Sequence, residues 1–107
     1  MVGEKIGRVM QDLRARLTEI YGTRLLKLVL YGSQARGEAS DESDIDVLVV
    51  LKGSVDPGEE IARSEYAVSA VSLAHQVVVT CFFVSEEQYA VEQSPLLLNI
   101  RREGVVV

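Results

Sequence analysis

The sequence predicts a protein of the α/β (α+β) class, with its helices and strands in the order α-β-β-α-β-α-α. Three observations support this class. Apolar residues recur at helical spacing near the N-terminus, two short apolar runs flank a polar loop, and a third apolar run follows a second helical stretch. With 107 residues, 48% of them hydrophobic, the chain has the size of one domain, and we expect a single domain over residues 1–107.

The first predicted element is an amphipathic helix that ends near Gly22. Its apolar residues recur three or four positions apart and therefore share one face. They are Ile6, Val9, Met10, Leu13, Leu17 and Ile20. Two buried strands follow, Leu25–Tyr31 and Ile45–Leu51, because both runs are short and apolar and are ended by Gly32-Ser33 and Lys52-Gly53. The polar loop between these strands has room for one helical turn.

Start signals place the next helix and strand. Asp56 before Pro57 is typical of a helix N-cap followed by proline in the first turn, and the helical stretch runs to about Ala74. The segment from His75 to Val84 then has strand character.

Two short helices are predicted near the C-terminus. Ser85-Glu86-Glu87-Gln88 has the form of a capping box, which indicates the start of a helix. Ser94-Pro95 repeats the start signal for a last helix, which Gly104 ends as a C-cap residue.

The charge and hydropathy of the chain exclude several functions. A formal net charge of −5 and a pI near 4.8 argue against general nucleic-acid or anionic-membrane binding, because both partners select basic surfaces. The apolar stretch Val77–Val84 is far shorter than the roughly 20 residues of a membrane-spanning helix, so we expect no membrane span. Residues 1–17 lack the apolar core of a signal peptide, and we expect a cytoplasmic protein.

The single cysteine and the single histidine are expected to be structural. Cys81 has no second cysteine for a disulfide or a CxxC site and lies in an apolar strand, which is typical of a small core residue. His75 has no second histidine for a zinc cluster, so we expect a surface or capping role.

An acidic pair lies at the entrance of the second strand. Asp44 and Asp46 are separated by one residue, so their carboxylates share one face while Ile45 and Val47 point to the other. Two adjacent carboxylates repel each other, and the pKa of one is raised unless a cation joins them. Because Mg²⁺ prefers one or two carboxylates with water and phosphate oxygens, the pair predicts a metal site.

The end of the first strand predicts a phosphate-binding turn. Gly32 lets a phosphate approach the backbone closely, and the Ser33 hydroxyl and the N–H groups of a following turn supply donors. Arg36, one turn later, suits either a phosphate contact or a surface ion pair with Glu38 or Asp41.

Together these residues resemble the signature of the polymerase-beta-like nucleotidyltransferase superfamily. The signature here is Gly32-Ser33, ten intervening residues and Asp44-x-Asp46. Ala35-Arg36-Gly37, Ser43 and the apolar strand after the second acid are most similar to its minimal nucleotidyltransferase branch, and length and element order agree. The resemblance implies the nucleotidyltransferase fold, with a small mixed β-sheet flanked by helices.

The same resemblance implies an enzyme that works on a nucleoside triphosphate with two Mg²⁺ ions. In this family an acceptor hydroxyl attacks the α-phosphate, nucleoside monophosphate is transferred and pyrophosphate leaves, while the two metals stabilise the attacking and leaving oxygens. By this resemblance Asp44 and Asp46 are the catalytic, metal-binding residues, and Gly32, Ser33 and Arg36 bind the triphosphate. AMP from ATP is the expected group, and a hydroxyl of a protein or another acceptor receives it.

The chain departs from the family pattern at one place. The family usually carries a third carboxylate on the later strand, whereas residues 76–84 contain no acid, and Thr80 has the only hydroxyl in that strand. A neutral hydroxyl is a poor metal ligand and a poor base. Either another acid reaches the site, for example Glu65 or one from a partner chain, or the nucleotide binds with slow or no turnover.

This departure keeps an alternative function open. Minimal nucleotidyltransferases are often encoded beside a small helical HEPN-type protein, as an antitoxin and a toxin. The alternative is a catalytically weak or inactive module that binds nucleotide or such a partner. A homo-oligomer is also open, and the sequence indicates neither the acceptor nor the base preference.

Overall fold

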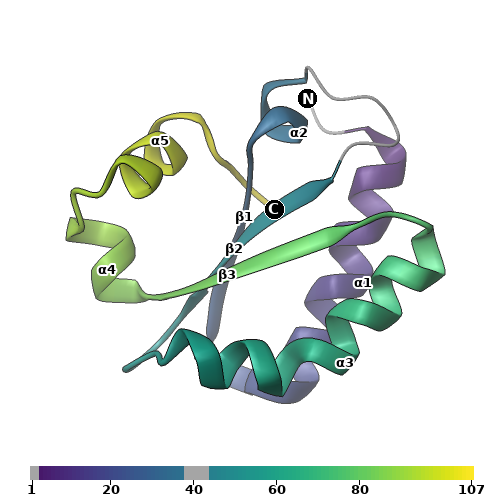
Figure 1. The fold of residues 1–107 in the computed structure, drawn as a ribbon, viewed down its shortest axis with the longest axis horizontal. Coiled ribbons are helices and arrows are strands. Elements are labelled where there is room, and N and C mark those ends of the chain that lie inside the picture. Colours follow the sequence, from purple (N-terminus) through teal and green to yellow (C-terminus); the bar gives the residue numbers. More distant parts are fainter. Residues whose placement is uncertain (1–2, 38–43) are drawn as a thin grey trace.

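Helices cover both faces of a four-stranded sheet in the computed structural model, which describes residues 3–37 and 44–107 (Figure 1). The strand order is β3-β2-β1-β4. The strands are β1 (Leu25–Tyr31), β2 (Ile45–Leu51), β3 (Val79–Ser85) and β4 (Val105–Val106). β1 is antiparallel to β2 and β4, whereas β2 and β3 are parallel, so the sheet is mixed, as predicted.

The helices follow the predicted order with small additions. They are α1 (Glu4–Tyr21), the 3₁₀ turn η1 (Gly22–Arg24), α2 (Ser33–Arg36), α3 (Pro57–His75), α4 (Glu86–Val91) and α5 (Pro95–Glu103). The turn α2 occupies the predicted polar loop. The strand β4 was not predicted, because a two-residue strand in an apolar tail has no periodicity to read. Within the described ranges, no helix is both long enough and apolar enough to span a membrane.

The predicted helix caps are confirmed. The Asp56 side chain accepts hydrogen bonds from the backbone N–H groups of Gly58 and Glu59 at 3.1 and 3.3 Å. Ser85 and Gln88 form a complete capping box, with bonds of 3.0 and 3.1 Å in the two directions. These short-range contacts fix where α3 and α4 begin.

The boundary between α3 and β3 differs from the prediction. The helix continues to His75, Gln76 ends it in the left-handed conformation with φ of 54°, and β3 begins only at Val79. Ser72 stabilises this connection, because its carbonyl accepts from the N–H of Val77 and its hydroxyl accepts from the N–H of Val79. An apolar run of valines does not show this turn in the sequence.

Gly104 occupies the predicted C-cap, but for a different reason than a left-handed turn. Its φ is −67°, which any residue adopts. A Cβ at Gly104 would stand 2.5 Å from the carbonyl oxygen of Ile100 and 2.6 Å from Cγ1 of Val29. Glycine therefore lets the end of α5 pass close to β1, which places β4 beside that strand.

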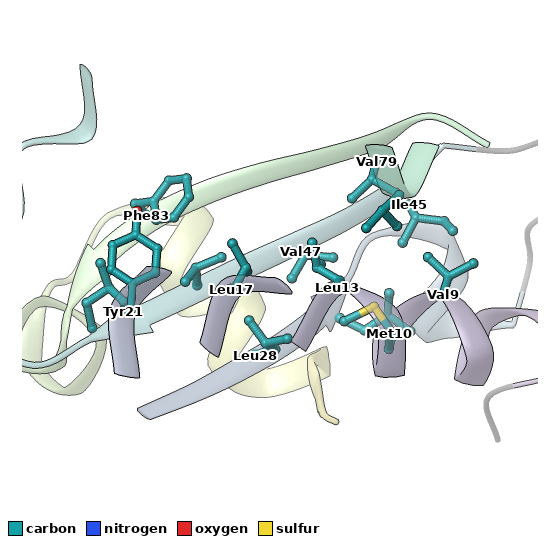
Figure 2. Close-up of a cluster of buried hydrophobic side chains, with 14 residues drawn as sticks. Val9, Met10, Leu13, Leu17, Tyr21, Leu28, Ile45, Val47, Val79 and Phe83 are labelled. Carbon is teal, nitrogen blue, oxygen red and sulfur yellow. The ribbon is translucent and has the colours of Figure 1, made fainter. Parts of the chain in front are cut away.

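The core lies mainly between α1, α3 and one face of the sheet. Figure 2 shows α1 side chains packed against residues of β1, β2 and β3. The labelled residues are Val9, Met10, Leu13, Leu17, Tyr21, Leu28, Ile45, Val47, Val79 and Phe83. On the other face, Leu48 and Val50 of β2 pack with Leu97 and Ile100 of α5. The second face is therefore the one on which the even-numbered residues of β2 lie.

Candidate functional site

Two strand ends bring the predicted site residues together. Tyr31, the last residue of β1, pairs with Asp46 near the start of β2. Gly32 follows with φ of 75° and ψ of −154°, a conformation that essentially only glycine adopts. A Cβ at Gly32 would stand 2.7 Å from Oδ2 of Asp46. The backbone of Gly32 therefore lies directly against the Asp46 carboxylate.

The turn α2 starts immediately after this contact, at Ser33. The N–H of Arg36 donates to the carbonyl of Gly32 at 3.3 Å, and Gly37 ends the turn in the left-handed conformation. The first N–H groups of a helix have no acceptor inside it. The site thus places a turn with a serine hydroxyl and such N–H donors next to a carboxylate, as a phosphate–metal site requires.

The two acids lie at the start of β2, close enough to affect each other electrostatically. Ile45 and Val47 are fully buried in the core on the α1 and α3 side, while Asp46 is half-buried and Asp44 is exposed. Alternation along β2 puts the Asp46 carboxylate on the α5 side, and Asp44, one residue before the strand, is near enough for its charge to act on Asp46. At the start of β2, Asp46 is therefore partly accessible to solvent, whereas Ile45 and Val47 are not.

Electrostatics at the site follow from this packing. Burial raises the pKa of Asp46 above its ordinary value, and the negative charge of Asp44 raises it further. Burial also raises the pKa of the Tyr31 phenol, with the charge of Asp46 adding to the effect. Burial and repulsion therefore both disfavour the ionised form of Asp46, and a bound cation would offset the repulsion between the two carboxylates.

Sequence reasoning missed the part of the site that α5 supplies. A cavity of about 200 Å³ lies between the end of β1, α2 and α5. Its lining residues are Tyr31, Gly32, Arg36, Leu96, Asn99, Ile100 and Glu103. The apolar pair Leu97 and Ile100 indicated that α5 packs against the core, but its spacing does not predict which part of the sheet α5 contacts.

Arg36 lies at the rim of this cavity, and Nη1 stands 3.6 Å from Oε2 of Glu103. This ion pair was not among the predicted ones. The predicted pairs with Glu38 or Asp41 involve residues outside the described part of the chain.

Thr80 occupies the position beside Asp46 on the neighbouring strand. The two residues are partners in the parallel ladder of β2 and β3. Val84, which shares the parity of Thr80, packs on the α5 side, so Thr80 lies on the same face as Asp46. Glu65 of α3 lines a cavity of about 290 Å³ together with Thr80, and Asp46 is not among the residues that line it. Among the described residues, no group of three or more acids, histidines or cysteines is arranged to hold a metal.

A larger cavity, about 430 Å³, lies at the other end of the sheet, near Arg24, Lys52 and Arg63. Arg24 and Arg63 are engaged in structural contacts. Arg24 donates to the carbonyls of Lys52 and Ser54, and Arg63 forms a 3.0 Å ion pair with the buried Glu60. The bonds of Arg24 join η1 to the segment after β2, and the ion pair lies within α3.

The histidine and the cysteine are structural in this fold. His75 Nε2 lies 3.0 Å from Oδ2 of Asp12 and so links the end of α3 to α1. Burial raises the pKa of the Cys81 thiol to about 12, which agrees with the predicted core role and keeps the thiol protonated.

A family model and several described proteins are similar to this chain in sequence. The nucleotidyltransferase domain family model matches residues 10–99. A Methanocaldococcus jannaschii protein named "Putative protein adenylyltransferase MJ0604" is 36% identical over 85 residues, which cover 77% of this chain and 76% of that protein. A second one from the same organism, MJ1305, is 26% identical over 90% of this chain and 56% of its own length.

Solved structures share the fold. A structure described as a toxin-antitoxin with AMP-PNP has a TM-score of 0.59 at 18% identity, covering 90% of this chain and 70% of that one. A structure described as a "putative minimal nucleotidyltransferase" has a TM-score of 0.56 at 24% identity and covers 92% of both chains. At these identities the structures show the fold alone, while the family model spans most of the chain. The chain therefore belongs to the nucleotidyltransferase domain family.

Proposed function

We propose that this domain binds a nucleoside triphosphate, with ATP as the expected one, together with Mg²⁺, and transfers AMP to a hydroxyl of a protein acceptor. The observation that carries the proposal is the contact between Gly32 and Asp46, which sets a phosphate-binding turn against a metal-binding carboxylate. Relatives named as protein adenylyltransferases support the protein as acceptor.

The residues present fit a divalent cation. Asp44 and Asp46 supply oxygen ligands on one face, and the charge repulsion that raises the pKa of Asp46 is the repulsion that a cation would remove. Mg²⁺ bound there would stabilise negative charge on the phosphate oxygens and on the attacking and leaving oxygens.

The chain's own residues have separate roles in this proposal. The turn at Gly32 and Ser33 binds and orients the β- and γ-phosphates, and Arg36 adds a positive charge at the rim of the α5 cavity. In the transfer, the acceptor oxygen forms a bond to the α-phosphorus while the bond to the β-phosphate oxygen breaks, so that pyrophosphate leaves with its electron pair. The described residues place no acid beside Asp46 on β3 to take the acceptor proton, so this step is expected to be slow.

A second candidate function rests on that same position. Thr80, a neutral residue, is the β3 partner of Asp46. Because a neutral hydroxyl is a poor general base, the site is consistent with nucleotide binding without turnover. The structure described as a toxin-antitoxin with AMP-PNP supports the version in which this chain is the antitoxin of a small helical HEPN-type toxin. Co-purification of such a helical protein with the chain from its native source tests the pairing.

Calorimetric titration of Mg²⁺ and AMP-PNP into the wild type and into Asp44→Asn/Asp46→Asn tests the site itself. We expect binding to the wild type and at least a tenfold loss in the double variant. The matched control is Glu86→Gln/Glu87→Gln, which makes the same charge change at exposed positions of α4 and should bind like the wild type. Equal binding by all three proteins would contradict the proposed site.

Transfer is tested separately with ATP labelled at the α-phosphate. Mg²⁺-dependent label on a protein acceptor, lost in Asp44→Asn/Asp46→Asn, would support the enzyme. Binding without label on any acceptor, including a co-purifying partner, would favour the second candidate.

A further inference from the structure

The cavity between β1, α2 and α5 adjoins the proposed phosphate-binding turn. Gly32 belongs to both, because its backbone lies against the Asp46 carboxylate and it also lines the cavity. Tyr31, the strand partner of Asp46, lines the cavity from β1. A group bound in the cavity would therefore lie next to a phosphate held by the turn.

The size and lining of the cavity suit an uncharged ring. Pockets that enclose a drug-sized ligand have volumes of roughly 300–1,000 Å³, so this cavity of about 200 Å³ encloses part of a nucleotide rather than all of it. Tyr31, Leu96 and Ile100 give it an apolar lining. Leu96 is 40% exposed although it is apolar, so a ring placed against it would remove apolar surface from water.

Charge disfavours the phosphates in this cavity. Glu103 lines it, and a carboxylate repels the negative oxygens of a phosphate. The cation at the rim, Arg36, stands 3.6 Å from the same carboxylate, which offsets part of its charge. The phosphates therefore belong on the turn at Gly32 and Ser33, and the base is the part of the nucleotide that fits the cavity.

Asn99 supplies an amide on the α5 wall of the cavity. It follows Leu96 by three residues and precedes Glu103 by four, so the three residues share one face of α5. Its Oδ1 accepts from Nη2 of Arg102 at 2.8 Å, which leaves the second lone pair of that oxygen for a ligand. Within the described ranges the amide nitrogen Nδ2 meets no acceptor. The amide therefore has both an acceptor and donors available.

We propose that the base of the nucleotide lies in this cavity and that Asn99 selects adenine, an inference that rests on the proposed nucleotide site. An asparagine amide is complementary to the N6–N7 edge of adenine, where N6–H donates to Oδ1 and Nδ2–H donates to N7. Guanine has acceptors at both O6 and N7 of this edge. Because the bond from Arg102 fixes Oδ1 as the oxygen end of the amide, O6 of guanine would face an acceptor. Asn99 is thus a specificity-determining residue for ATP over GTP.

Calorimetric titration in the presence of Mg²⁺ compares AMP-PNP with GMP-PNP, which differ only in the base. We expect the wild type to bind AMP-PNP at least about tenfold more tightly, since a bidentate pair discriminates between bases by about that factor. Asn99→Leu should lose affinity for AMP-PNP and bind both analogues equally. Gln93→Leu is the matched control, because Gln93 is an exposed amide just before α5 that does not line the cavity, and this variant should discriminate like the wild type. Circular dichroism checks that both variants are folded.

A second ligand pair tests the N7 contact alone. 7-Deaza-ATP lacks the N7 acceptor but keeps the N6 amino group of ATP. We expect the wild type to bind it about fivefold more weakly than ATP, because one hydrogen bond is lost. Asn99→Leu should bind the two nucleotides equally. Each result is a ratio of two affinities in one protein, so a general effect of the substitution on α5 packing cancels.

The outcomes separate this inference from the proposed function. Equal affinity of the wild type for AMP-PNP and GMP-PNP, or the same discrimination in Asn99→Leu as in the wild type, would overturn the role of Asn99 and leave the nucleotide site standing. If the wild type bound none of these nucleotides, the proposed function would fail and this inference with it.

Discussion

Gly32 lies against the Asp46 carboxylate where β1 ends and β2 begins, and a side chain at Gly32 would displace that carboxylate. A Cβ there would stand 2.7 Å from Oδ2 of Asp46. The backbone at φ of 75° adds a conformational cost of about 1–3 kcal/mol for any other residue. A side chain at Gly32 is therefore expected to move the Asp46 carboxylate away from the turn.

Gly32→Ala should consequently lower both stability and the affinity for Mg²⁺–AMP-PNP. We expect at least a tenfold loss of affinity, because the Asp46 carboxylate must move away from the turn. The matched control is Gly53→Ala: Gly53 also has positive φ, 86°, but a Cβ there meets nothing within 4 Å. Calorimetry on both variants separates the effects, and equal affinities in the two variants would contradict the role of the contact.

Asp46→Asn should stabilise the apo protein while it removes metal binding. Burial and the charge of Asp44 raise the pKa of Asp46 in the folded state. A raised folded pKa means that the native state binds more protons than the unfolded state, so stability falls as pH rises from the ordinary value of 3.8 through the folded value. Thermal melts without metal should show a higher Tm for Asp46→Asn at neutral pH, and the difference should vanish below pH 3.8. A lower Tm at neutral pH would contradict this prediction.

Thr80→Asp tests whether the neutral residue beside Asp46 limits the site. A third carboxylate at this position would share a face with Asp46 and add a metal ligand and a base. We expect about tenfold tighter Mg²⁺ binding and a higher rate of AMP transfer, together with a lower apo Tm from added repulsion. Thr80→Asn is the control that keeps the shape without the charge, and a gain of equal size in that variant would argue against a carboxylate effect.

The sequence predicted the strands that carry the candidate site residues better than it predicted the surrounding elements. Asp44 and Asp46 could be placed on one face because strand alternation is a local rule, and burial of Ile45 and Val47 agrees with it. The contact between Gly32 and Asp46 was not predicted, because it depends on the register of the two neighbouring strands. The roles of these residues in binding nucleotide and metal are not tested by the fold and stay predictions.

The parts that sequence reasoning missed depend on long-range packing. The cavity wall from Asn99 and Glu103 arises only when α5 docks on the sheet, and the strand Val105–Val106 exists only because β1 offers it an edge. The end of α3 was misplaced since Ser72, inside the helix, forms the bonds that turn the chain. None of these leaves a periodic signal in the sequence.

Tyr21→Phe should destabilise the fold through a buried carboxylate. The Tyr21 hydroxyl donates to Oε1 of Glu60 at 2.8 Å, and Glu60 is only 3% exposed. Removing this donor leaves Oε1 of Glu60 with Arg63 as its remaining partner, and loss of the hydrogen bond costs about 0.5–1.5 kcal/mol. Urea unfolding measures this cost. Tyr66 is 87% exposed, so Tyr66→Phe should leave the unfolding midpoint unchanged, and an equal shift in both variants would contradict the role of the Glu60 bond.

The link between Asp12 and His75 should make stability depend on acid pH. Burial raises the pKa of Asp12, but hydrogen bonds from His75 and Arg16 outweigh it, so the pKa lies below the ordinary 3.8. The folded state therefore keeps Asp12 ionised where the unfolded chain has protonated it. Its contribution to stability is complete above pH 3.8 and is lost as pH falls through the lowered folded value.

Asp12→Asn should thus lower the free energy of unfolding at neutral pH by about 0.2–1 kcal/mol, with a smaller difference from the wild type in strong acid. Urea titrations at neutral pH and below pH 3 measure both values. Glu19→Gln changes an exposed acid of the same helix and should show no such pH dependence. If the difference between Asp12→Asn and the wild type were the same at both pH values, the ion pair would not be its cause, and the loss would have to come from packing between α1 and the end of α3.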